Sequence, residues 1–84
     1  MNQSLPNTIV DNVTQFEVKY KEIVENIVQN RKQSQTTQDE MANWLKISRS
    51  TLTDFESVKR MDFSLLVKYG YHMGIDVKLN FEIN

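Results

Sequence analysis

The chain lacks cysteine altogether, and it has a single histidine, His72. Without cysteine it forms neither a disulfide nor a thiolate metal site, and one histidine cannot anchor a zinc site of the usual kind. We therefore expect no metal and no cofactor, and the missing cysteine fits a cytoplasmic protein. No apolar run approaches the roughly 20 residues that a membrane-spanning helix needs. The first ten residues contain no basic residue, so we expect no secretory signal either.

Glycine, proline and net charge are also scarce, with two glycines, one proline and a net charge of −1 in 84 residues. A chain this short forms one small domain, which often gains stability by oligomerisation. This net charge is not typical of nucleic-acid-binding proteins, which are usually basic. Residues 31–60 nevertheless hold six basic residues against four acidic ones. If a protein with so little net charge binds DNA through one basic segment, it is expected to do so mainly as a dimer.

The N-terminal third divides into an arm and a helix. Residues 1–12 contain Pro6 and several polar residues without a sustained pattern, which predicts an N-terminal arm. Thr14 suits a helix N-cap, and Glu17 completes a capping box. A helix is predicted from there to about Arg31 or Gln33, because apolar residues recur at helical spacing. These apolar residues are Phe16, Tyr20, Ile23, Val24, Ile27 and Val28.

The most informative segment is 37–57, which predicts two short helices joined by a tight turn. Thr37 and Glu40 form a capping box at the first helix, and Ser48 caps the second, which ends near Glu56. A helix-turn-helix must bury its apolar positions to hold the second helix at a steep angle, free to enter a DNA major groove. The apolar positions here are Met41, Leu45, Ile47, Leu52 and Phe55.

The C-terminal part predicts a fourth helix and then a strand. The helix opens at Met61 or Asp62 and is stopped by Gly74, which completes a helical domain over residues 13–74. Apolar and polar residues then alternate, which indicates a half-buried strand over residues 75–84. A single strand needs a partner, either its own copy in a second subunit or the segment 8–10. The predicted dimerisation residues are Ile75, Val77, Leu79, Phe81 and Ile83.

The spacing of Gln38, Ala42 and Glu56 resembles the lambda-repressor-like, XRE-type helix-turn-helix family over about residues 31–75. The resemblance implies an all-α bundle of four to five short helices and an ion pair between Arg31 and Glu56. The helix ending at Gly74 and the strand after it look like HipB-type antitoxin repressors. Those proteins dimerise through a C-terminal β-strand, repress their own operon and bind a toxin.

One departure from the family pattern lies in the turn. Lys46 stands where the family has glycine, and a positive φ there would cost on the order of 1 kcal/mol. The Lys46 side chain could instead reach a phosphate.

The resemblance to the family places Arg49 at a position from which it can form a bidentate contact with guanine. It places Asp54 where the carboxylate can accept a hydrogen bond from cytosine, or can keep the Arg49 side chain in position. Lys59 and Arg60 follow the second helix of the helix-turn-helix, where we expect them to contact DNA phosphates. The alternative is that they are a pair of solvated surface charges. The alternative for Arg49 is a contact with phosphate alone. The expected DNA-binding residues are Gln38, Lys46, Ser48, Arg49, Ser50, Thr51, Thr53, Asp54, Lys59 and Arg60.

Several other residues are expected to have packing roles. Trp44 is expected to be a partly buried aromatic residue, and Gly70 to allow close helix packing. His72 is expected at the surface or packed, while Tyr69 and Tyr71 could line a partner surface or belong to the core. No residue pattern supports an enzyme. We therefore expect a dimeric DNA-binding regulator that represses its own promoter at a pseudo-palindromic operator, or alternatively an antitoxin that mainly neutralises a toxin protein.

Overall fold

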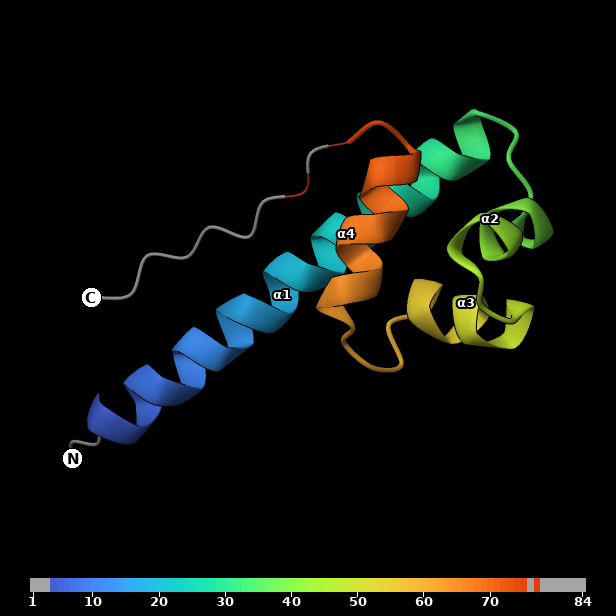
Figure 1. Ribbon diagram of the computed structural model, residues 1–84. Coiled ribbons are helices and arrows are strands. Elements are labelled where there is room, and N and C mark those ends of the chain that lie inside the picture. The colour runs from blue at the N-terminus through green and yellow to red at the C-terminus, as the bar shows by residue number, and fades with distance from the viewer. Residues whose placement is uncertain (1–3, 76, 78–84) are drawn as a thin grey trace.

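The computed structural model describes residues 4–75 and residue 77, and for residues 4–13 it describes the backbone alone. These residues form four α-helices and no strand, which confirms an all-α fold. The elements are α1 (Ser4–Gln33), α2 (Gln38–Leu45), α3 (Arg49–Glu56) and α4 (Phe63–His72). In Figure 1, α2, α3 and α4 gather around the C-terminal half of α1, whose N-terminal part extends away from them. Residue 76 and residues 78–84 of the predicted strand lie outside the described residues, so the strand remains a prediction.

Helix α1 is longer than the sequence pattern indicated. It begins at Ser4, so residues 4–12 are helical and the predicted N-cap Thr14 lies inside the helix. Pro6 does not prevent this, because the amide hydrogens of a first turn have no partner within the helix and their loss there costs little. The predicted arm and the alternative strand at residues 8–10 are therefore wrong for this segment.

The predicted N-caps Thr37 and Ser48 are confirmed, and Asp62, one of the two predicted opening residues of the fourth helix, is the N-cap of α4. The Thr37 hydroxyl accepts from the backbone N–H of Glu40, while the Glu40 carboxylate accepts from the Thr37 N–H. Ser48 caps α3 through the N–H of Thr51, and Asp62 caps α4. Each cap satisfies a backbone donor that would otherwise have no partner, which fixes where each helix begins.

Each helix ends near a residue in the left-handed conformation, at Gln35, Lys46, Val58 and Gly74, with φ of 62°, 59°, 58° and 73°. After α2, the N–H of Ile47 donates to the carbonyl of Ala42 at 3.0 Å, which closes a Schellman turn. The expected positive φ at Lys46 is therefore confirmed.

Buried apolar side chains from all four helices form one core. Helix α2 packs on α3 and α4, and α1 packs on the same two helices, so both helices of the α2–α3 pair contact the rest of the bundle. Of the apolar positions predicted for the helix-turn-helix, all are buried except Ile47, which is half-buried. The core consists of Tyr20, Val24, Ile27, Met41, Ala42, Leu45, Leu52, Phe55, Leu65, Leu66 and Tyr69.

A buried polar cluster ties the four helices together. Glu56 of α3 accepts hydrogen bonds from Arg31 of α1 at 2.8 Å, Gln38 of α2 at 2.9 Å and the Tyr69 hydroxyl of α4 at 2.5 Å. Arg31 also donates to the Thr36 carbonyl at 2.7 Å. The Arg31–Glu56 ion pair implied by the family resemblance is thus present. Its charges are removed from water, and each is met by several hydrogen bonds.

The cluster perturbs the ionisation of its members. Burial, followed by the hydrogen bond and the charge of Glu56, raises the pKa of Tyr69 well above its ordinary value. Burial opposes the charge of Arg31, but the hydrogen bond and the charge of Glu56 outweigh it and raise the pKa of the guanidinium. Both groups therefore keep their protons at neutral pH, and the hydrogen bonds to Glu56 stay formed.

Candidate nucleic-acid interface

Helix α3 has one buried face and one exposed face. Leu52 and Phe55 point into the core, whereas Arg49, Ser50 and Thr53 are exposed. Because residues 52 and 55 lie three apart on a helix, they anchor a single face and leave the opposite one to solvent. The chain therefore presents a short polar helix, held firmly from behind, at the surface next to the α2–α3 turn (Figure 1).

Ser48 and Thr51 form a local hydrogen-bonded pair at the start of α3. The Ser48 hydroxyl accepts from the Thr51 N–H at 3.0 Å and donates to the Thr51 hydroxyl at 2.9 Å. Ser48 is exposed and Thr51 is partly exposed. Their first task is to start the helix, of which Arg49 is the first residue.

The ion pairs differ from those weighed in the sequence. Arg49 lies 3.7 Å from Asp39 of α2, and both side chains are largely exposed. Asp54 lies 3.5 Å from Lys59 instead, so it does not hold Arg49 in position. Exposed pairs of this kind contribute only about 0–1 kcal/mol, so either basic side chain can leave its partner for a stronger anion at little cost.

Gln38 is less available than predicted, because its side-chain amide donates to Glu56. The first turn of α2 also carries Asp39 and Glu40, whose negative charges oppose a phosphate at that helix end. Because the side chain is engaged, only the backbone of Gln38 is left to contact a phosphate. Lys46, by contrast, is exposed in the turn between α2 and α3.

Lys59 and Arg60 are exposed in the loop after α3. They line a hollow of about 380 Å³ whose wall also includes Lys21 and Glu17 of α1. Lys21 was not among the predicted contacts, because nothing in the spacing of the sequence relates α1 to this loop. The structure thus gathers three basic side chains at the end of α3 remote from Arg49.

Two of the predicted dimerisation residues lie in the described part of the chain, after α4. Ile75 and Val77 are half-buried and line a hollow together with Val67 and Tyr71. A Cβ atom on Gly70 would clash with the Val77 side chain, so Gly70 is small because the chain folds back over α4 rather than because two helices meet. Leu79, Phe81 and Ile83 lie outside the described residues.

None of the described helices has the length and the apolar character required to cross a membrane. The chain was also compared with protein-family models, with curated proteins and with solved structures. None of these comparisons found a match.

Proposed function

We propose that this protein is a sequence-specific DNA-binding regulator that reads duplex DNA with α3 and represses transcription from its own promoter. The observation that carries the proposal is the two-faced α3. Leu52 and Phe55 fix one face in the core, and Arg49, Ser50 and Thr53 project from the other. A recognition helix in the lambda-repressor-like layout requires the same division.

In this mechanism α3 enters the major groove with its N-terminal residues closest to the bases. Arg49 exchanges its exposed contact with Asp39 for the O6 and N7 atoms of a guanine, a bidentate contact that contributes about 1–3 kcal/mol of discrimination. Lys46 lies at one end of α3, and Lys59 and Arg60 lie at the other. These three cations contact phosphates on either side of the groove and set the register of the helix.

The protein acts as a dimer in this proposal. A chain of net charge −1 has little long-range attraction for DNA, and two copies double the number of specific contacts. Residues 75–84 of the two copies pair as antiparallel strands across a two-fold axis. The two α3 helices then sit in successive major grooves about 34 Å apart, so the operator is a pseudo-palindrome. A dimer bound there represses by blocking the promoter.

The proposal is tested by selection from random duplex DNA at moderate salt, using the natural protein and the Arg49→Ala variant in parallel. We expect an enriched inverted repeat, in which Arg49→Ala relaxes the base preference at one position of each half-site. Lys19→Ala serves as the control, because Lys19 is an exposed basic residue on α1, and it should select the same repeat.

Two outcomes would contradict the proposal in different ways. If Arg49→Ala weakens binding equally on all sequences, Arg49 contacts phosphate alone and does not read bases. If no sequence is enriched, α3 does not read DNA, and binding to a partner protein becomes the main role, as in the antitoxin alternative.

A further inference from the structure

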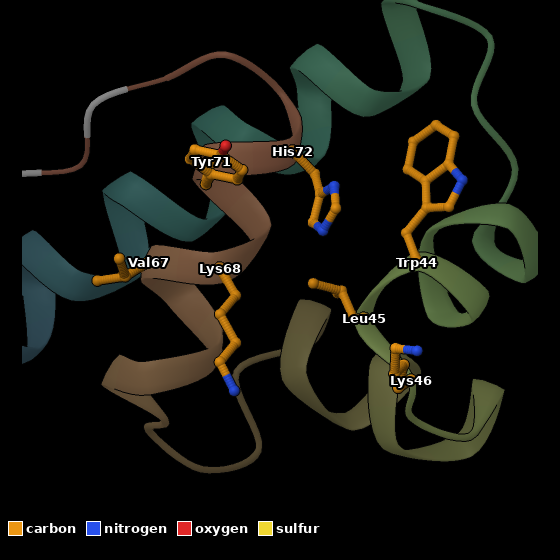
Figure 2. Close-up of a pocket in the computed structure, with 7 residues that line it drawn as sticks. All are labelled: Trp44, Leu45, Lys46, Val67, Lys68, Tyr71 and His72. Carbon is orange, nitrogen blue, oxygen red and sulfur yellow. The ribbon is translucent and has the colours of Figure 1, made fainter.

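A groove of about 400 Å³ lies between α2 and α4, and Lys46 is the one lining residue that it shares with the proposed DNA surface. Figure 2 shows the Trp44 ring of α2 facing the His72 ring of α4, with Leu45 between the two helices. We call this feature the Trp44 groove. It is lined by Trp44, Leu45, Lys46, Val67, Lys68, Tyr71 and His72.

The groove exposes large apolar side chains that nothing in the described part of the chain covers. Trp44 is 46% exposed, Val67 is 54% exposed and Tyr71 is 78% exposed. Val18 is the one other large apolar side chain with comparable exposure among the described residues. Single exposed apolar residues are ordinary in proteins, whereas three gathered around one hollow indicate a binding surface.

The walls of the groove are already in place. The Trp44 and His72 rings stack with centroids 5.8 Å apart and an interplanar angle of 23°, and Tyr71 meets His72 edge-on at 5.9 Å. Leu45 is buried below them as part of the core. A side chain that enters this hollow therefore meets aromatic and aliphatic surfaces that need little rearrangement, which lowers the cost of binding.

The charge around the groove indicates the chemistry of the molecule that it binds. Lys46 and Lys68 are among its lining residues, and none of the lining residues is acidic. The groove therefore carries positive charge, although the whole chain has a net charge of −1. An apolar hollow bordered by cations is complementary to a segment that combines apolar anchors with carboxylates.

We propose that the Trp44 groove binds an acidic polypeptide segment of a partner protein, which packs an aromatic or aliphatic side chain against the rings of Trp44, His72 and Tyr71. Carboxylates of the segment pair with Lys46 and Lys68. This inference goes beyond DNA reading and does not rest on it. A second copy of the chain fits the groove less well, because a two-fold contact through this face would set these lysines against one another.

The experiment uses the full chain and a phage-displayed library of random dodecapeptides. Enriched peptides are synthesised and titrated while the emission of Trp44 is followed, because Trp44 is the single tryptophan of the chain. We expect peptides rich in aspartate or glutamate with one aromatic or large aliphatic residue. Their binding should shift the emission of Trp44.

Two groove variants and two controls locate the binding. Lys68→Glu should weaken binding about tenfold by reversing a charge at the rim, and Tyr71→Ala should weaken it about tenfold or more by removing an anchor wall. Lys19→Glu makes the same charge change on α1, away from the groove, and should bind the peptides as the natural protein does. Arg49→Ala should also bind them unchanged, which separates this inference from the DNA-reading function.

Three outcomes would overturn the inference. They are a library that yields no enriched acidic peptide, peptides whose affinity is the same for Lys68→Glu and Lys19→Glu, and peptides that leave the emission of Trp44 unchanged. A single-stranded oligothymidylate that binds tightly, shifts the emission and displaces the peptides would also overturn it. The groove would then be a base-stacking surface.

Discussion

Glu56 illustrates how one side chain fixes the arrangement of a small domain. Its two oxygens receive hydrogen bonds from residues of α1, α2 and α4, although Glu56 itself belongs to α3. A carboxylate at this depth is stable because its charge is met by Arg31 and its remaining lone pairs by neutral donors. Since each of these bonds needs a particular helix position, the cluster favours one packing of the bundle over its alternatives.

We predict that Glu56→Gln destabilises the protein by about 3–5 kcal/mol. The change keeps the shape of the side chain but leaves the Arg31 guanidinium buried without a counter-charge, which is far costlier than losing an exposed pair. Denaturant-induced unfolding followed by circular dichroism measures the effect. Asp54→Asn is the control, because it removes the exposed partner of Lys59 and should cost at most about 1 kcal/mol. Equal losses for the two variants would contradict the account.

The sequence predicted some of these residue contacts and missed others for clear reasons. The Arg31–Glu56 pair followed from the spacing of a family motif. The Tyr69 hydroxyl on Glu56 could not be anticipated, because a tyrosine at helical spacing indicates only a core position. The contact between Arg49 and Asp39 depends on how α2 and α3 cross, and sequence spacing does not encode that angle.

At the level of elements, the sequence predicted the starts of the three shorter helices and the ends of α1 and α3, but not the start of α1. A start depends on a cap and its neighbour three residues on, as at Thr37 and Glu40, so the signal is local. The ends usually rely on glycine in the left-handed conformation, yet only Gly74 supplies it among the four. The start of α1 was missed because Pro6 indicates a loop as readily as it fits a first helical turn.

The scarcity of glycine leads to a prediction for the turn between α2 and α3. Lys46→Gly should stabilise the fold by about 1 kcal/mol, because glycine adopts the positive φ without strain, although its freedom in the unfolded chain offsets part of the gain. The same variant should bind DNA more weakly, because it removes the proposed phosphate contact of Lys46. Thermal unfolding and a DNA titration measure the two effects.

Gln35→Gly is the matched variant for this test, since Gln35 has the same backbone conformation at the end of α1. It should raise the stability by a similar amount and leave DNA affinity unchanged. If both variants lower DNA affinity equally, the lysine side chain has no role at the DNA. If neither variant gains stability, the strain is relieved elsewhere.

At the scale of the whole molecule, the proposed dimer depends on the C-terminal segment. A chain of residues 1–74 should sediment as a monomer and bind the selected operator on the order of a hundredfold more weakly, because the second half-site no longer adds to the first. Analytical ultracentrifugation and a DNA titration test this.

Two point variants check that the loss does not arise from shortening alone. Leu79→Asp replaces an apolar position of the alternating pattern, and Asn80→Asp places the same charge on the polar side. The first should dissociate the dimer and the second should not. A dimer that survives both truncation and Leu79→Asp must be held by another surface.

Helix α1 has one further consequence. Phe16 meets Phe63 of α4, whereas the N-terminal turns of α1 extend away from α2, α3 and α4 (Figure 1). The end of a helix frays more readily than its middle, whereas the turns around Tyr20 and Ile27 open only when the core does. Backbone amides along one uninterrupted helix should therefore exchange with deuterated water over a steep gradient of rates, fast near Ser4 and slowest near Ile27.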